Sequence, residues 1–131
     1  MIRVVAGILT RGDEILICQR TRHQTKPLKW EFPGGKIETG EQPRDALRRE
    51  LEEELGIQAD VGDEVERLTH TYEDGGVVEL RFFAVPSFTG ELENRIFREI
   101  LWVPRKRLVE YDFLEADVPL VRLLAAGKLS S

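Results

Sequence analysis

This 131-residue sequence contains only one cysteine and no long apolar run. A single cysteine, Cys18, means that no disulfide can form within the chain, as is typical of a reducing compartment. No stretch approaches the roughly 20 apolar residues that a membrane-spanning helix needs. The segment Met1–Leu9 carries one arginine in a short apolar run and is typical of a strand, not of a signal peptide. We therefore expect a cytoplasmic protein without a membrane partner.

Basic residues are also fewer than acidic ones. The chain has 19 Lys and Arg against 24 Asp and Glu, a net charge of −5, whereas a protein that binds a nucleic-acid polymer needs a basic face. A small nucleotide stays compatible with this balance because bound cations would offset an acidic site. No linker, repeat or low-complexity segment interrupts the sequence, so we expect residues 1–131 to form a single domain. Whether it is a monomer or a homodimer stays open.

The spacing of apolar and turn-forming residues predicts strands on both sides of one long helix. This helix begins at Pro43, which suits a first helical position, and ends before Gly56, which suits the left-handed position beyond a helix end. The order implies a mixed β-sheet between helices, an α/β fold (α+β by some conventions). The other elements are strands at Ile2–Leu9, Glu14–Arg20, Val65–Glu73, Val77–Val85 and Glu99–Val103, a helical turn at Pro104–Val109 and a closing helix at Val118–Ala126.

Carboxylates crowd the C-terminal half of the predicted helix. Glu50 is three positions from Glu53 and four from Glu54, and like charges at these spacings cost roughly 0.2–0.5 kcal/mol each. Glu50 and Glu54 lie at one edge of a stripe of leucines and Glu53 a little further round, so we expect the carboxylates where the helix meets the protein body. Arg49 is four positions before Glu53 and can hold it in position. A divalent cation would relieve their repulsion, and ligands that offer only oxygen suit Mg²⁺, Mn²⁺ or Ca²⁺ and not zinc. The alternative is an ordinary solvated helix face.

A glycine-rich segment before the helix favours the ligand-binding interpretation. Phe32-Pro33-Gly34-Gly35 is expected to form a rigid turn, and Thr39-Gly40 a second one. Glycines in these places let a backbone carbonyl or amide come close to a metal or a phosphate.

Residues 35 to 57 resemble the signature motif of the Nudix family, G-x5-E-x7-R-E-U-x-E-E-x-G-U with U apolar, at every specified position. The resemblance implies a Nudix α/β/α sandwich that hydrolyses its substrate with the help of a divalent metal. The matching residues are Gly35, Glu41, Arg49, Glu50, Leu51, Glu53, Glu54, Gly56 and Ile57.

The resemblance also implies roles for these residues. Either Glu50 or Glu53 would be the general base that deprotonates the attacking water. Arg49 would orient the carboxylates, and Lys36 would add positive charge at the phosphates. The cofactor would be Mg²⁺, with Mn²⁺ as a possible substitute. The implied metal ligands are the carbonyl of Gly34 and the carboxylates of Glu50, Glu53 and Glu54.

The longer match Glu31–Glu41, EFPGGKIETGE, places the chain near the MutT-like branch of the family. By this resemblance Arg20, Glu31 and Phe32 belong to a nucleotide pocket, and Asp117 stands where the branch carries its base-reading side chain. Each has an alternative: Arg20 could pair with solvent, Phe32 could belong to the core, and Asp117 could cap the last helix.

One departure from the branch concerns a further acidic ligand. MutT-like enzymes often supply it from the loop before the tryptophan that corresponds to Trp102, commonly six residues upstream. That position is Ile96 here. Glu99 and Glu93 are the acidic candidates nearby, with Glu99 preferred, so the number of metals stays open.

We expect from this resemblance an enzyme that hydrolyses nucleoside triphosphates to a monophosphate and pyrophosphate with Mg²⁺. The expected substrate is an oxidised purine nucleotide such as 8-oxo-dGTP. The nearest alternative is a pyrophosphohydrolase that prefers CTP or dCTP. A non-catalytic Nudix domain that senses a nucleotide is an alternative of a different class, and the complete set of acidic residues argues against it.

Overall fold

The structure of the protein, a computed structural model, describes residues 1–128. No helix in this range is long and apolar enough to span a lipid bilayer. Its elements in chain order are β1 (Ile2–Arg11), β2 (Glu14–Gln19), β3 (Trp30–Glu31), β4 (Gly34–Lys36), α1 (Pro43–Leu55), β5 (Gln58–Asp60), β6 (Glu64–Thr71), β7 (Val77–Val85), β8 (Ser87–Thr89), β9 (Glu99–Pro104), the 3-10 helices η1 (Arg105–Glu110) and η2 (Glu115–Asp117), and α2 (Val118–Ala125).

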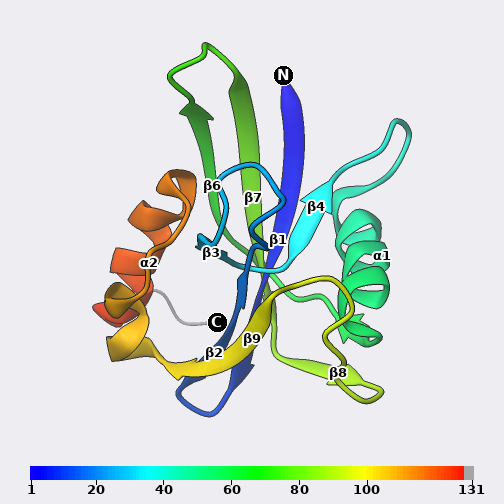
Figure 1. Cartoon of the computed structure of the whole chain (residues 1–131). Coiled ribbons are helices and arrows are strands. Elements are labelled where there is room, and N and C mark those ends of the chain that lie inside the picture. Colours follow the sequence, from blue (N-terminus) through cyan, green and yellow to red (C-terminus); the bar gives the residue numbers. More distant parts are fainter. Residues whose placement is uncertain (129–131) are drawn as a thin grey trace.

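One mixed sheet forms the centre of the molecule (Figure 1). Its strands follow the order β3-β2-β1-β7-β6, while β4 also pairs with β1 and β9 with β2. The β1–β7 pair is parallel, and the other strand pairs of this sheet are antiparallel. A parallel pair needs a crossover connection, and the chain between β1 and β7, which includes α1, provides it. Strands β5 and β8 form a separate antiparallel pair.

The two faces of the sheet are each covered by a helix (Figure 1). Successive residues of a strand point to opposite faces, so Ile8 of β1 packs in the same cluster as Leu120 of α2. Its neighbour Leu9 packs in the cluster of Leu47 and Leu51 of α1. The predicted α/β/α sandwich with a mixed sheet is therefore confirmed.

Most of the predicted elements are confirmed with shifts of a residue or two at their ends. Strand β7 has the predicted bounds, and α1 begins at Pro43 and ends before Gly56, which adopts φ 70°. The expected helical turn after β9 is the 3-10 helix η1. Strands β5 and β8 were not predicted, because three-residue strands leave little periodic signal.

The glycine-rich segment differs from its prediction. Gly34 and Gly35 pair with Ala6 and Val5 of β1 as part of β4, so the prediction of a rigid turn across them is wrong. A Cβ on Gly34 would collide with the carbonyl of Val5, so glycine is what allows the two backbones to approach this closely. The turn at Thr39-Gly40 is confirmed. The glycines are thus fixed to the central sheet, next to α1.

Candidate active site

The guanidinium of Arg49, on α1, donates hydrogen bonds to several carboxylates. Its Nε and Nη2 donate to the two carboxylate oxygens of Glu41 at 2.8 and 3.0 Å, and its Nη1 donates to Glu50 at 2.9 Å. Nη2 also donates to the carbonyl of Lys36 at 3.1 Å and so ties α1 to β4. Glu53, the partner expected from helical spacing, is a longer contact at 3.5 Å. A planar guanidinium with five donors can hold this many acceptors at once.

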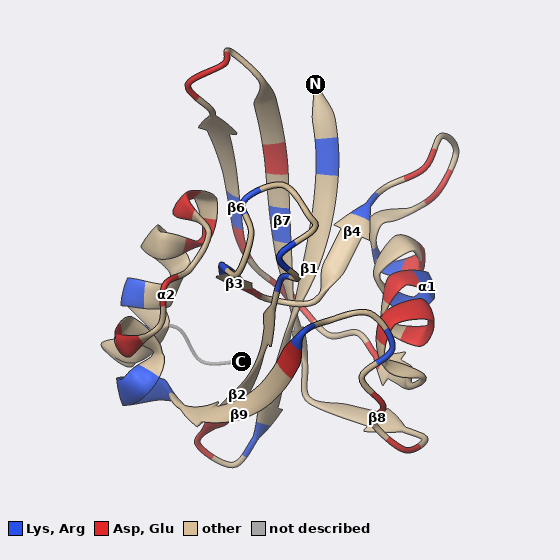
Figure 2. Ribbon diagram, in the orientation of Figure 1, with Lys and Arg blue, Asp and Glu red and all other residues tan. Residues whose placement is uncertain are grey.

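The network changes the acidity of the carboxyls it contains. Hydrogen bonds from Arg49, and then from the backbone N–H of Glu38, lower the pKa of Glu41 to about 2. The pKa of Glu50 is raised instead, because burial outweighs the hydrogen bond and the charge of Arg49. Glu41 therefore stays ionised near neutral pH and anchors the guanidinium. Figure 2 shows the acidic residues gathered on α1 and on the loop before it.

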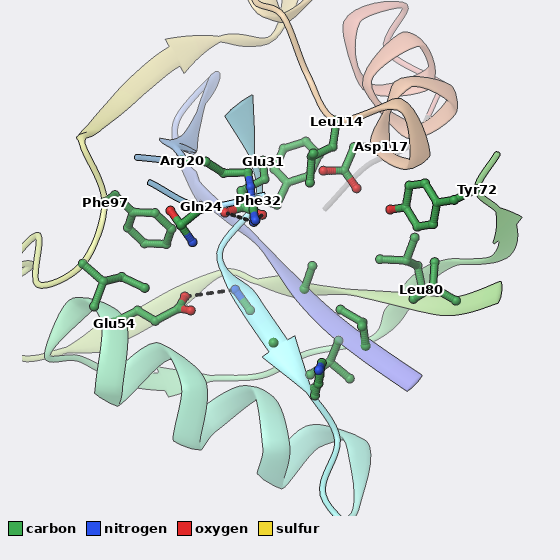
Figure 3. A pocket seen from close by; sticks show the side chains of 18 residues that line it. Arg20, Gln24, Glu31, Phe32, Glu54, Tyr72, Leu80, Phe97, Leu114 and Asp117 are labelled. Atoms are coloured by element: carbon green, nitrogen blue, oxygen red, sulfur yellow. Dashed lines mark hydrogen bonds and ion pairs between the residues drawn. The ribbon is translucent and has the colours of Figure 1, made fainter. Parts of the chain in front are cut away.

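Glu54 is the buried carboxyl of the cluster, with 9% of the residue exposed. Its Oε1 accepts a hydrogen bond from the backbone N–H of Gly34 at 3.2 Å (Figure 3). Burial, and then the negative charges of Glu50 and Glu31, raise the pKa of Glu54 to about 9. Within residues 1–128 no cationic side chain forms an ion pair with it. A buried carboxyl among negative neighbours favours either a proton or a bound cation.

Gly35 sets the position of Glu50. A Cβ at Gly35 would collide with the Glu50 carboxyl group, so this carboxyl lies directly on the strand backbone. Glu53 differs from both other glutamates, because 59% of its side chain is exposed and it faces outward from α1. The expectation that all three carboxylates lie where the helix meets the body thus applies to Glu50 and Glu54 more than to Glu53.

The chemistry of this cluster fits a divalent cation. Its donors are carboxylate and carbonyl oxygens, the ligands that Mg²⁺ and Mn²⁺ prefer, and none of the described residues is a positive partner of buried Glu54. No three acidic, histidine or cysteine side chains converge as a ready metal-binding group in the described range. The reason is that Arg49 holds Glu50 while Glu53 points to solvent.

A pocket of about 250 Å³ begins at Glu54 and extends across the sheet to Asp117 (Figure 3). Its volume is somewhat below the roughly 300–1,000 Å³ of pockets that enclose drug-sized ligands, so it suits one part of a nucleotide. The pocket brings together seven of the residues predicted from sequence, from five different segments of the chain. These are Arg20, Glu31, Phe32, Gly34, Lys36, Glu54 and Asp117.

Arg20 is engaged within the protein and is not paired with solvent. Its Nη1 donates to Glu31 at 3.2 Å, while Nε and Nη2 donate to the carbonyl and hydroxyl of Thr25 at 2.8 and 3.1 Å. Burial raises the pKa of Glu31, although the charge and hydrogen bond of Arg20 oppose the shift. Arg20 therefore holds the loop after β2 against the pocket wall.

Asp117 stands at the N-cap position of α2, but its side chain makes no capping hydrogen bond. It is 4% exposed and lines the pocket. Burial, and then the charge of Glu31, raise the pKa of Asp117 to about 8, against the opposing effects of the Phe32 backbone N–H and of Arg20. Near neutral pH most of this carboxyl is protonated, so it offers one hydrogen-bond donor and one acceptor.

Phe32 is both a core residue and a pocket residue, as its two interpretations from sequence propose separately. Its ring packs against Phe113 at 5.3 Å and against Phe82 at 6.3 Å between ring centres, inside the core that faces α2. It also contributes to the pocket lining. The core thereby fixes one wall of the pocket.

Tyr72 and Gln24 are pocket residues that sequence reasoning missed. Tyr72 follows β6, and the ammonium of Lys26 lies 4.1 Å from the centre of its ring. Gln24 belongs to the loop after β2 and accepts a hydrogen bond from the N–H of Thr21 at 2.8 Å. No local pattern distinguishes them from other polar loop residues; only the folded arrangement places them at the pocket.

The two acidic candidates outside α1 are not lining residues of the pocket. Glu99 is exposed at the start of β9, opposite Gln19 of β2, and it is not among the lining residues. Glu93 forms an ion pair with Arg95 at 3.1 Å. Ile96, at the position where the branch often carries an acid, contributes to the pocket lining.

Comparison with known proteins agrees with this geometry. Residues 1–124 match the NUDIX domain family. The CTP pyrophosphohydrolase of Escherichia coli strain K12 is 39% identical over 127 residues, which cover 96% of this chain and 93% of that protein. The 8-oxo-dGTP diphosphatase of Haemophilus influenzae is 36% identical over 125 residues, which cover 95% and 91%. The solution structure of the E. coli ORF135 protein matches with a TM-score of 0.86 and 38% identity, over 96% of this chain and 89% of that one.

The chain therefore belongs to the Nudix family and is a MutT-like Nudix hydrolase.

Proposed function

We propose that the protein hydrolyses nucleoside triphosphates to a nucleoside monophosphate and pyrophosphate and that it requires Mg²⁺. One observation carries the proposal: a single pocket extends from Glu54 of the carboxylate cluster to Asp117 on the far side of the sheet strands. Glu54 and Gly34 lie at one side of the pocket, whereas Asp117 and Tyr72 lie at the other (Figure 3). A nucleotide bound with its base at Asp117 would extend its phosphates toward α1.

The proposed metal ligands combine the buried and exposed carboxylates of α1 with backbone oxygen. When bound, the cation would neutralise phosphate charge and polarise the attacking water, and Mn²⁺ could replace Mg²⁺. Glu99, at the start of β9, is the proposed ligand from outside α1. The full set is Glu50, Glu53, Glu54, the carbonyl of Gly34, and Glu99.

The remaining catalytic roles follow from the contacts of each side chain. Glu50 and Glu53 are both candidates for the general base. The exposed Glu53 is favoured because Arg49 contacts it only at 3.5 Å, which leaves its carboxylate free to reach a water. Arg49 orients Glu50 through the 2.9 Å hydrogen bond. Lys36 lines the pocket close to α1 and would add positive charge at the phosphates.

The protonated carboxyl of Asp117 supports an oxidised purine as the substrate. Guanine presents two adjacent acceptors, N7 and O6, at its Hoogsteen edge. In 8-oxoguanine N7 carries a hydrogen, so the same edge offers a donor beside an acceptor. A neutral carboxyl complements that pair, whereas unmodified guanine would set an acceptor against an acceptor, and such a mismatch strongly disfavours a ligand. We therefore propose 8-oxo-dGTP as the preferred substrate.

CTP is the second candidate. The N3 acceptor and the N4 amino donor of cytosine also complement a neutral carboxyl. The relative named for CTP hydrolysis shares 39% identity over 96% of this chain. The assay of base preference therefore includes CTP.

The test compares 8-oxo-dGTP, dGTP and CTP with the wild type, Asp117→Ala and Asp117→Asn. Losing one neutral hydrogen-bond partner costs roughly 1–3 kcal/mol, so Asp117→Ala should lower kcat/KM for the preferred nucleotide by about 5- to 150-fold. The poor substrates should change little. Asp117→Asn, whose amide also offers a donor and an acceptor, should keep most of the activity. An equal loss for all three nucleotides in Asp117→Ala would refute the role of Asp117 in base recognition.

A further inference from the structure

The loop between β8 and β9 closes the C-terminal end of α1 (Figure 1). The backbone N–H of Glu93 donates to the carbonyl of Leu55 at 2.9 Å, and the N–H of Arg95 donates to the carbonyl of Glu54 at 3.1 Å. The side chain of Arg95 adds a third bond, from Nη1 to the carbonyl of Glu52 at 3.1 Å. The last carbonyls of a helix have no partner inside the helix, so the loop supplies donors for those of Glu54 and Leu55. The carbonyl of Glu52 already accepts from the N–H of Gly56 at 3.0 Å, and the guanidinium of Arg95 is a second donor to it.

The guanidinium of Arg95 supplies a positive charge that the last turn of α1 does not contain. The last turn of α1 contains no basic residue, although cations are favourable at the negative C-terminal end of a helix dipole. Arg95 lies so close to Gly56 that a Cβ at this glycine would be 2.8 Å from Nη2. Gly56 therefore provides the space that the guanidinium occupies, as well as the left-handed turn that ends α1.

The same loop builds part of the pocket. Asn94 holds the chain in a tight turn, because its side chain donates to the carbonyl of Phe97 and accepts from the N–H of Phe97, both at 2.8 Å. Phe97 and Ile96 line the pocket, and Phe97 lies on the same side of it as Glu54 (Figure 3). One compact loop thus holds both the end of the carboxylate helix and the pocket wall beside it.

We propose that Arg95 is a positioning residue, which holds the last turn of α1 so that Glu53 and Glu54 stay in place for the metal. The proposal rests on the proposed function in that it assigns metal binding to these glutamates. The hydrogen bonds of Arg95 to α1 go to the carbonyls of Glu52 and Glu54 and not to carboxylates, so Arg95 acts through the helix backbone. Its ion pair with Glu93, at 3.1 Å, keeps the guanidinium over the helix end.

The test replaces Arg95 with Met, which keeps an unbranched apolar stem like that of arginine but removes both the charge and the donors. Arg98→Met is the matched control, because Arg98 lies in the same loop but donates to Gln19 and not to α1. Three properties are measured: amide hydrogen exchange without metal or nucleotide, Mn²⁺ affinity without nucleotide, and kcat and KM at saturating Mg²⁺. The first two do not depend on which nucleotide is hydrolysed.

For Arg95→Met we expect faster exchange confined to the last turn of α1 and Mn²⁺ binding that is weaker by about 3- to 10-fold. We expect kcat to fall by on the order of tenfold, since small displacements of catalytic groups are costly, while KM changes by less than about twofold. Arg98→Met should match the wild type in all three. If Arg95→Met does not fold, Arg95→Lys is used instead, because lysine keeps the charge and has a single donor nitrogen. Arg95→Lys should show the same changes in exchange, Mn²⁺ affinity and kcat, each smaller than in Arg95→Met.

Two results would overturn the proposal. One is Mn²⁺ affinity and local exchange equal to those of Arg98→Met; the other is faster exchange spread over the whole chain, which would mark a general effect on stability. A wild type that hydrolyses no nucleoside triphosphate would contradict the proposed function alone. The exchange and Mn²⁺ measurements would still decide the role of Arg95.

Discussion

Replacing Asp117 with Asn should change how the stability of the protein depends on pH. Burial raises the pKa of Asp117 to about 8 in the folded protein, against 3.8 for an ordinary aspartate. The folded chain therefore keeps a proton that the unfolded chain releases above about pH 4. The stabilisation from this proton is fully present below about pH 4, declines as the pH rises, and is gone above about pH 8.

The size of the effect follows from the linkage between proton binding and folding. One proton held only by the folded state changes the free energy of unfolding by about 1.4 kcal/mol per pH unit, so the wild type should lose about 3 kcal/mol from Asp117 between pH 5 and pH 7. The amide side chain at position 117 of Asp117→Asn does not titrate, so this variant should not lose that part of the free energy of unfolding. The buried Glu54 contributes a similar loss, but it does so in both proteins, so their difference isolates Asp117.

The assay is urea unfolding of the wild type and of Asp117→Asn at pH 5, 6 and 7 and constant ionic strength. The matched control is Asp112→Asn, because the side chain of Asp112 is 75% exposed and pairs with Lys29 at the surface. The control should follow the pH dependence of the wild type. A constant difference between the wild type and Asp117→Asn across this pH range would refute the assignment of a protonated Asp117.

Three further predictions concern the carboxylate cluster and the proposed ligand outside α1. Glu53→Gln should lower kcat by about 10²- to 10⁴-fold with little effect on thermal unfolding, as measured by turnover and calorimetry, because it removes a general base or ligand and relieves repulsion. Gly35→Ala should displace the Glu50 carboxyl and lower kcat while circular dichroism stays unchanged; wild-type kcat would contradict that contact. Glu99→Gln should lower kcat and weaken the Mg²⁺ dependence, whereas Glu93→Gln should not; equal behaviour of the two would remove Glu99 from the ligand set.

The elements that could be predicted from sequence are those with local signals. Pro43 and Gly56 mark the ends of α1 because each matches the backbone conformation needed at its end of a helix. The contact of Arg49 with Glu53 was also expected from helical spacing. The shorter hydrogen bonds from Arg49 to Glu41 were not expected, because Glu41 lies before the helix, where helical spacing does not identify neighbours.

The parts that could not be predicted depend on contacts between distant segments. The turn expected at Gly34 and Gly35 is a strand because β1 offers a partner that the local sequence does not reveal. Tyr72 reaches the pocket only because β6 lies beside β7 in the sheet, and nothing in its own neighbourhood in sequence indicates this. The resemblance to the family placed Arg20 and Asp117 in one pocket, but the protonation of Asp117 follows from burial, which only the folded chain shows.

The products formed from a nucleoside triphosphate test the central proposal most directly. The protein is incubated with 8-oxo-dGTP and Mg²⁺, in parallel with CTP, and the phosphorus-containing products are quantified by ³¹P NMR. We expect equal amounts of nucleoside monophosphate and pyrophosphate, and no turnover when a chelator exceeds the metal. Release of orthophosphate with a nucleoside diphosphate, or full turnover in excess chelator, would contradict the account.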